Sequence, residues 1–365
     1  MNSIIIQTPK GPRVIGPGQP VFIVAEMSAN HNQSYDRAVE LVETAADCGV
    51  DAVKLQTYTA DTMTIDCDRD YFQINEGQWK GQSLYQLYQL AYTPWEWQPK
   101  LRDLAEKRGL TLFSTPFDET AVDFLEKNGI NHLYKVASFE LIDLPLLRKI
   151  GKTGRPVIAS CGMASEEEIK LAVEALNGVG NLQVALLHCL SSYPAKPDEM
   201  NLATIPDMMK KFKVAVGLSD HSLDEEVART AVSLGASIVE KHFTKSRSEE
   251  GPDAAFSLEP AELKSLVKAI RQQEKAEPGK LTASTKKIIG SPTYGPGGSQ
   301  GENKIFRRSL FAVKEIKRGE KFSKENIRSI RPGYGLNPRY YDEVIGQAAS
   351  QEVQRGTPLE WELIG

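Results

Sequence analysis

Short apolar runs alternate along this chain with segments in which apolar residues recur every three or four positions. The apolar runs cover residues 21–26, 51–58, 110–117, 133–140, 155–162, 184–194, 212–219 and 235–243. Such runs are typical of buried strands, and the intervening period is typical of amphipathic helices. Eight strands, each followed by a helix, predict an α/β protein with a (β/α)₈ barrel over roughly residues 20–276. An open doubly wound sheet is the alternative, which the count of eight disfavours.

Residues that favour helix ends divide these segments. Ser34, Ser165 and Ser222 each precede a helical segment, and the latter two have a glutamate three positions later, which is the capping-box pattern. Thr93 followed by Pro94 predicts another helix start. We therefore interpret Ser165 and Ser222 as helix caps and give them no catalytic role.

Composition changes after the last predicted helix of the barrel. Residues 278–303 are rich in Gly, Pro, Ser and Thr, which is typical of a linker. From Ile305 onward the pattern changes to short β-like runs separated by turn residues. We expect a barrel with a short N-terminal cover (1–277), a linker (278–303) and a small, mostly β domain (304–365).

Composition and charge narrow the class of protein. With 365 residues, 41% of them hydrophobic and 25% charged, the chain is long enough for a barrel and a second small domain. The net charge of −4 and the lack of a basic stripe give no reason to expect nucleic acid. The sequence has no apolar stretch of membrane-spanning length and no signal-peptide core, and its four cysteines are scattered. We expect a cytoplasmic protein without membrane contact.

Polar side chains stand at the end of nearly every predicted strand. In (β/α)₈ barrels the reactive groups gather at these carboxyl ends. The residues concerned are Glu26, Lys54, Gln56, Ser114, Thr115, Lys135, Ser138, Glu140, Ser160, His188, Ser191, Tyr193, Ser219, His221, Glu240 and His242. The pattern predicts a polar pocket that can bind an anion.

Two histidines end neighbouring predicted strands. His221 and His242 could be two ligands of an exchangeable divalent metal, and imidazole suits Mn²⁺ or Zn²⁺. Alternatively, both rings are hydrogen-bonded to neighbouring carboxylates. His31, His132 and His188 lack this pairing, and we interpret them as structural.

Two lysines lie within apolar strands, where an unpaired ammonium is too costly to keep. Lys54 and Lys135 could bind phosphate, since Thr115, Ser138, Ser160 and Ser219 would add hydroxyl donors. A Schiff-base lysine and an ion pair to Glu26 or Glu140 are the alternatives, and the hydroxyl cluster favours phosphate. Glu26 and Glu240 are candidate acid–base groups, although either could merely neutralise a lysine. Trp79, within a stretch rich in aromatic residues, is a candidate lid over a substrate.

Several motifs resemble the sialic acid synthase family. They are AEMSANHNQS, DAVKLQTYT, FSTPF, YKVASFE, HCLSSYP, VGLSDHS, IVEKHF, RRSLFAVKEIKRGE and IRPGYG. The resemblance implies a (β/α)₈ barrel followed by an antifreeze-like (SAF) domain. It also implies metal-dependent condensation of phosphoenolpyruvate with an acetamido sugar, by C–O cleavage, to give a nine-carbon 2-keto acid.

The segment around Trp79 is more similar to the pseudaminic acid branch of this family than to its N-acetylneuraminate branch. The sugar implied is 2,4-diacetamido-2,4,6-trideoxy-L-altrose, with legionaminate or N-acetylneuraminate precursors as alternatives. A Schiff-base aldolase and a non-catalytic binding module remain as rivals from other classes.

The resemblance also implies roles for individual residues. Phosphoenolpyruvate would be held by Lys54, Thr115, Lys135, Ser138, Ser160, Ser191 and Ser219, although other branches have Asn at the position of Ser191. His221 and His242 would hold Mn²⁺ or Mg²⁺, and catalysis would involve Glu26, Glu240 and His242. The sugar would contact Gln56, Trp79, Glu140, Tyr193, Asp253 and Arg331. The resemblance further implies a domain-swapped homodimer, in which Arg331 enters the neighbouring site.

Overall fold

The computed structural model describes residues 3–76, 79–249, 251–276, 283–296, 303 and 305–365. Its main sheet has eight strands in the order β5-β4-β3-β10-β9-β8-β7-β6, all in parallel register. The strands are β3 (Phe22–Glu26), β4 (Ala52–Thr57), β5 (Thr111–Pro116), β6 (Tyr134–Val136), β7 (Val157–Ser160), β8 (Val184–Cys189), β9 (Ala215–Asp220) and β10 (Ile238–His242). Because the end strands β5 and β6 also contact each other, the sheet closes as a (β/α)₈ barrel, and the prediction of fold class is confirmed.

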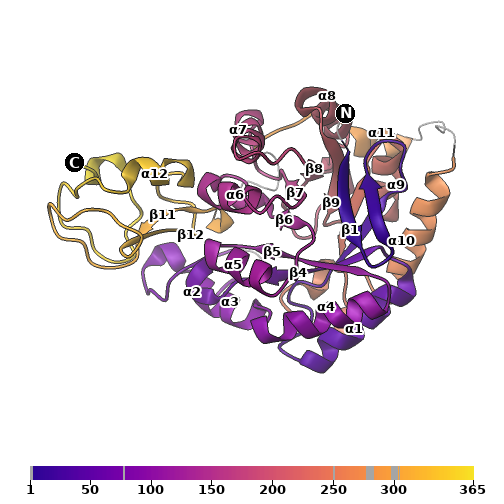
Figure 1. Cartoon of the computed structure of the whole chain (residues 1–365), viewed down its shortest axis with the longest axis horizontal. Coiled ribbons are helices and arrows are strands. Elements are labelled where there is room, and N and C mark those ends of the chain that lie inside the picture. Colours follow the sequence, from indigo (N-terminus) through magenta and orange to yellow (C-terminus); the bar gives the residue numbers. More distant parts are fainter. Residues whose placement is uncertain (1–2, 77–78, 250, 277–282, 297–302, 304) are drawn as a thin grey trace.

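Helices alternate with the strands and surround the sheet (Figure 1). They are α1 (Tyr35–Cys48), α4 (Gln98–Lys107), α5 (Glu119–Lys127), α6 (Leu144–Gly151), α7 (Glu166–Asn177), α8 (Thr204–Phe212), α9 (Glu225–Ser233) and α10 (Pro260–Gln273). Two shorter helices, α2 (Ala60–Met63) and α3 (Leu84–Ala91), lie between β4 and β5. No helix among the described residues is long and apolar enough to cross a membrane.

The caps of two helices agree with the sequence pattern, and two predicted starts are wrong. Ser34 and Ser165 accept hydrogen bonds from the first turns of α1 and α7. Asp224, not Ser222, caps α9, because Ser222 lies earlier in a buried turn where its N–H donates to the Asp220 carboxylate. Thr93 does not cap α4: its hydroxyl lies 3.1 Å from His31 Nε2, and a 3₁₀ turn separates it from the helix.

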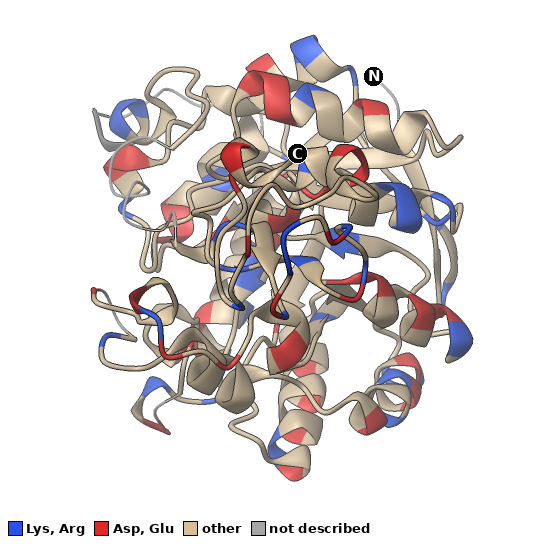
Figure 2. Ribbon diagram, turned by 90° about the vertical axis from the view of Figure 1, so that its left-hand side faces the viewer, with Lys and Arg blue, Asp and Glu red and all other residues tan. Residues whose placement is uncertain are grey.

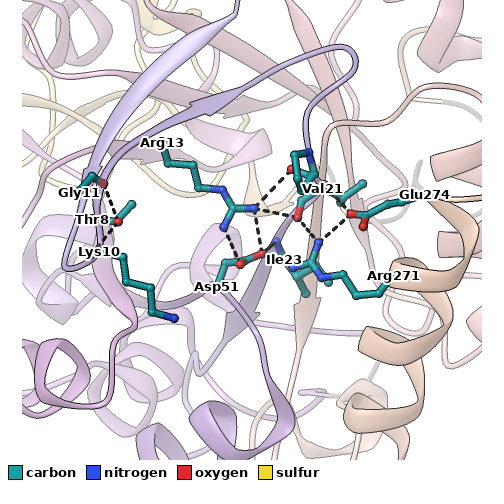
Figure 3. A network of polar contacts seen from close by, with 10 residues as sticks. Thr8, Lys10, Gly11, Arg13, Val21, Ile23, Asp51, Arg271 and Glu274 are labelled. Carbon is teal, nitrogen blue, oxygen red and sulfur yellow. Dashed lines mark hydrogen bonds and ion pairs between the residues drawn. The ribbon is translucent and has the colours of Figure 1, made fainter.

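An N-terminal hairpin closes the amino-terminal end of the barrel. Strands β1 (Ile4–Thr8) and β2 (Gly11–Ile15) are antiparallel, and their apolar side chains join the core inside the barrel. The Asp51 carboxylate binds Arg13 at 2.6 Å and Arg271 at 2.7 Å, which ties the hairpin and α10 to the start of β4 (Figure 3). This end is therefore packed shut, and the opposite end is left for the polar groups.

Asn131 holds the seam between β5 and β6. Its side-chain oxygen accepts from the Ser114 N–H at 2.8 Å, and its amide donates to the Ser114 carbonyl at 2.9 Å. The side chain thereby supplies the two hydrogen bonds that a neighbouring strand would provide. Buried backbone at the closure of the barrel is thus satisfied.

The C-terminal domain lies to one side of the barrel (left in Figure 1). It contains the antiparallel strands β11 (Ser309–Ala312) and β12 (Ile327–Ile330) and helix α12 (Tyr341–Val344), around an apolar core of its own. Figure 2, which faces this domain, shows acidic and basic segments interspersed over the surface. The predicted linker contains helix α11 (Ala283–Ile289), which contacts α9, while residues 278–282 and 297–302 lie outside the described part. The predicted domain boundaries stay predictions.

Candidate active site

Two lysines and two carboxylates from four strands meet at the carboxyl end of the barrel. Lys54 Nζ lies 2.7 Å from Glu26 Oε2 and 3.5 Å from Glu240 Oε1, and Lys135 Nζ lies 3.5 Å from the same Glu240 oxygen. All four side chains are buried. The cost of burying these charges is offset, because each of them has an opposite charge beside it. The ion pair between Lys54 and Glu26, one of the sequence alternatives, is therefore present.

The two carboxylates differ in proton affinity. Burial raises the pKa of Glu26, and the neighbouring Lys54 only partly opposes this. Burial acts on Glu240 in the same sense, but Lys135 and Lys54 outweigh it and lower the pKa of that carboxyl. Burial also lowers the pKa of Lys135, against the attraction of Glu240. Two carboxyls with opposite shifts in one site are suited to hold and to accept a proton, respectively.

Hydroxyl groups surround these charges. Lys135 Nζ donates to Ser160 Oγ at 2.7 Å, Lys54 Nζ donates to Thr115 Oγ1 at 3.4 Å, and Ser219 Oγ donates to Glu240 Oε1 at 3.1 Å. Ammonium and hydroxyl donors around one point form a site that a phosphate or carboxylate can occupy.

Gly162 brings two further predicted hydroxyls together. A Cβ at this position would lie 2.2 Å from Ser191 Oγ and 2.9 Å from Ser138 Oγ, and the Gly162 N–H donates to Ser138. A side chain at this position would therefore displace the hydroxyls of both serines. Sequence reasoning did not single out Gly162, since a glycine after a strand is also an ordinary turn residue.

His221 and His242 end adjacent strands, with ring centroids 5.3 Å apart. His221 Nδ1 donates to the Leu190 carbonyl at 3.0 Å, which leaves the lone pair on Nε2. His242 Nδ1 is buried and has no hydrogen-bond partner among the described residues. Burial, assisted by His221, lowers the pKa of His242 far below its usual range, so this ring is neutral.

Two imidazole rings side by side fit a divalent metal ion. Within the described residues no group of three or more His, Cys, Asp or Glu side chains could hold such an ion. Water or substrate oxygens would thus complete the coordination. No ion pair joins either ring to a carboxylate in the described residues, which disfavours the alternative interpretation.

A pocket lined in part by His242 opens at this end of the barrel. Its polar side consists of Ser28, Gln56, Asp253, His242 and Arg331, and the remaining wall is mainly aromatic and aliphatic. Gln56 Nε2 donates to Glu26 Oε1 at 3.2 Å and to Ser28 Oγ at 2.9 Å, and Ser28 in turn donates to Asp253. Ser28 was not predicted, because no strand-end or spacing rule distinguishes it from other loop serines.

Glu140 and Arg331 form a second buried ion pair beside this pocket. Arg331 donates to Glu140 Oε1 at 2.8 Å and to the Tyr88 hydroxyl at 3.0 Å, and its guanidinium lies 5.1–5.6 Å from the ring centres of Tyr88, Phe117 and Phe139. Glu140 Oε2 and Arg331 Nε are buried and have no hydrogen-bond partner among the described residues. Glu140 does not line the pocket, so it acts on the pocket through Arg331, which does.

Trp79 and Tyr193 lie on the wall of the same pocket. Trp79 Nε1 donates to the Pro252 carbonyl at 3.0 Å, and its ring meets Phe306 edge-on at 5.4 Å. The Tyr193 ring lies 4.4 Å from that of His221. Of the predicted sugar-binding residues, all but Glu140 line this pocket, and Glu140 reaches it through its ion pair with Arg331. The three other histidines contact Thr93, Glu106 and the Met200 carbonyl elsewhere.

Comparison with known proteins gives matches over nearly the whole chain. Residues 41–281 match the NeuB family and residues 307–364 match the SAF domain. The chain is 41% identical to pseudaminic acid synthase from Campylobacter jejuni, over 93% of this chain and 95% of that one. It is 36% identical to N,N'-diacetyllegionaminic acid synthase from the same species, over 90% and 96%. The crystal structure of spore coat polysaccharide biosynthesis protein SpsE from Bacillus subtilis superposes with a TM-score of 0.83 at 33% identity, covering 97% of each chain.

Proposed function

Since the chain belongs to the NeuB family, we propose that it is a pseudaminic acid synthase. The reaction would join phosphoenolpyruvate to 2,4-diacetamido-2,4,6-trideoxy-L-altrose and release phosphate. C3 of phosphoenolpyruvate bonds to the aldehyde carbon of the open-chain sugar, whose oxygen takes up a proton. Water adds at C2 and loses a proton, and the C2–O bond to phosphate breaks.

The observation that carries this proposal is a buried cluster of cations and hydroxyls next to a pocket of different chemistry. The cluster has two ammonium groups and several hydroxyls, which suit the phosphate and carboxylate of phosphoenolpyruvate, and Gln56 joins it to the pocket by donating to Glu26. The wall of the pocket has the guanidinium of Arg331, the carboxylate of Asp253 and several aromatic rings. An acetamido group matches this wall, because its N–H can donate to a carboxylate, its carbonyl can accept from the guanidinium, and its methyl group can pack on the rings.

The residues have distinct roles in this proposal. Lys54 and Lys135 with their hydroxyl partners hold phosphoenolpyruvate, and Gln56, Asp253, Tyr193, Trp79, Glu140 and Arg331 hold the sugar. His221 and His242 would hold Mn²⁺ or Mg²⁺, which supplies a Lewis acid for the aldehyde oxygen. Glu26, whose pKa is raised by burial, can give a proton, and Glu240, whose pKa is lowered despite its burial, can take one from water.

Phosphate release from phosphoenolpyruvate with Mn²⁺ tests the proposal. The altrose sugar, the legionaminate precursor and N-acetylmannosamine are compared, each with and without a chelator. Chelator-sensitive release with the altrose sugar alone is expected. Release with another sugar would keep the family and change the substrate. Trapping of a covalent enzyme–substrate adduct by borohydride would instead indicate a Schiff-base lysine.

We also propose a cytoplasmic homodimer in which the C-terminal domains are exchanged. The cysteines are all free thiols, which suits a reducing compartment. In the single chain Arg331 reaches its own Glu140, and the same contact could form between subunits. Mixing Glu240→Gln subunits with Arg331→Ala subunits distinguishes a contact between subunits from a contact within one chain. If the C-terminal domains are exchanged, the mixture should regain about a quarter of the wild-type activity, and if the contact lies within one chain it should regain none.

A further inference from the structure

Arg308 is one of the largest fully buried side chains of the protein. It precedes β11, and its Nε donates to Glu140 Oε1 at 3.0 Å. Its other nitrogens donate to the Ser329 carbonyl at 2.7 Å, to the Thr62 carbonyl at 3.3 Å and to Met63 Sδ at 3.3 Å. A buried guanidinium with this many fixed contacts has little freedom to move.

Arg308 and Arg331 bind the same oxygen of Glu140. The register of β11 and β12 pairs Ser309 with Ile330, so the two arginines extend from the same end of this strand pair. Both are bonded to Oε1, at 3.0 Å and 2.8 Å, and Oε2 is left without a hydrogen-bond partner in the described part of the chain. Two cations bonded to one carboxylate oxygen fix the orientation of the carboxylate, and the carboxylate in turn fixes both guanidinium groups.

The carboxylate belongs to the barrel, and both arginines belong to the C-terminal domain. Glu140 is wholly buried, and a buried carboxylate without cations is strongly disfavoured. Docking of the C-terminal domain therefore supplies the charges that Glu140 needs. One of these cations, Arg331, lines the pocket, whereas Arg308 does not.

We propose that Arg308 is a positioning residue for the sugar subsite. It holds Glu140, whose Oε1 in turn fixes the guanidinium of Arg331 on the wall of the pocket, and it links completion of this subsite to docking of the C-terminal domain. This inference rests on the proposed function, because it takes Arg331 as a ligand of the sugar.

Steady-state kinetics of Arg308→Lys and Arg308→Met test the inference, with phosphate release measured against each substrate in turn. Loss of a hydrogen bond to a charged group predicts a rise in sugar KM of roughly 10- to 100-fold for Arg308→Met and a smaller rise for Arg308→Lys. The KM for phosphoenolpyruvate should stay within about twofold of the wild-type value, because the lysines and hydroxyls that would bind it are unchanged. Arg328→Met is the matched control, since Arg328 bridges the same domains through the Asp61 carbonyl without contacting Glu140.

Repeating the measurement in a Glu140→Gln background separates positioning from general loss of structure. There the substitution at Arg308 should change sugar KM by no more than about threefold, because the carboxylate that it orients is absent. Equal effects on both substrates, or an undiminished effect in the Glu140→Gln background, would overturn the inference. A wild-type enzyme inactive with every sugar would instead reject the proposed function. In that case denaturant unfolding of the two single variants and the double variant still gives the coupling free energy between Arg308 and Glu140, and a coupling of zero would overturn the inference.

Discussion

His221 and His242 face each other from adjacent strands, but their Nδ1 atoms differ in what they bind. The Nδ1 of His221 donates to the Leu190 carbonyl at 3.0 Å, whereas that of His242 has no hydrogen-bond partner among the described residues. The ring of His221 is thus fixed by the backbone. A metal bound between them would depend on His221 for orientation and would satisfy the buried nitrogen of His242.

Removal of either ring should abolish metal-dependent activity. We expect His221→Ala and His242→Ala to lower phosphate release by about 100-fold or more, because one imidazole cannot hold the ion alone. A chelator should inactivate the wild type, and added Mn²⁺ should restore it. His132→Gln is the control, since His132 is only partly buried and lies 3.9 Å from Glu106, away from the pocket. Full chelator-resistant activity of His242→Ala would exclude a metal at this pair.

Lys135 should act on phosphoenolpyruvate rather than on the sugar. Its ammonium donates to Ser160 and lies 3.5 Å from Glu240, within the buried cluster of lysines and carboxylates. Lys135→Met should raise the KM for phosphoenolpyruvate by roughly 100-fold, because a cation beside the anion is lost, and Lys135→Arg should have a smaller effect. Saturation curves for both substrates check this. An equal change in sugar KM would place Lys135 outside the phosphate site.

The barrel could be predicted from the sequence because buried parallel strands are continuous apolar runs and barrel helices have a clear period. The precise start of α9 could not. Ser222 satisfied the capping-box spacing, but the preceding Asp220 bonds Lys241 and the Ser222 N–H, so the turn continues to Asp224 before the helix begins. Tertiary ion pairing here overrides a local signal.

Residues of the site were predictable where they stand at strand ends, as Lys54 and Glu240 do. Arg308 was not, although two adjacent arginines before an apolar run are visible in the sequence. Its importance depends on the contact between the C-terminal domain and Glu140, some 168 positions away in the chain. Long-range pairing of this kind leaves no local periodicity.

Acid should destabilise the protein partly through His31. Burial, assisted by Arg37, lowers the pKa of this imidazole to about 4, whereas an unfolded histidine has a pKa near 6.5. The unfolded state therefore binds the proton more readily, so stability is fully present above about pH 6.5 and declines as the pH falls toward 4. At pH 5 the loss relative to pH 7 should be about 2 kcal/mol.

Denaturant unfolding of the wild type and of His31→Gln at pH 7 and pH 5 checks this prediction. Glutamine can still bond Thr93 or the Gln33 N–H but does not titrate, so the difference between the two pH values should shrink by about 2 kcal/mol. An unchanged difference would mean that other groups dominate the acid response.

Trp79 should affect the sugar through both its ring and its N–H. The indole donates to the Pro252 carbonyl at 3.0 Å and packs edge-on against Phe306. Trp79→Phe keeps an aromatic ring and loses one hydrogen bond, so the sugar KM should rise about 3- to 10-fold. Trp79→Ala should raise it further, because the wall of the pocket is also lost.

Intrinsic fluorescence adds a direct measurement of this contact. Sugar binding in the presence of phosphoenolpyruvate should change the emission of the wild type and leave that of Trp79→Phe unchanged. Trp361→Phe is the matched control, since Trp361 is 45% exposed on the C-terminal domain and packs on Tyr340. If Trp79→Ala kept the wild-type sugar KM, the predicted lid role of this residue would be wrong, and the Pro252 contact would serve only to close the loop onto the barrel.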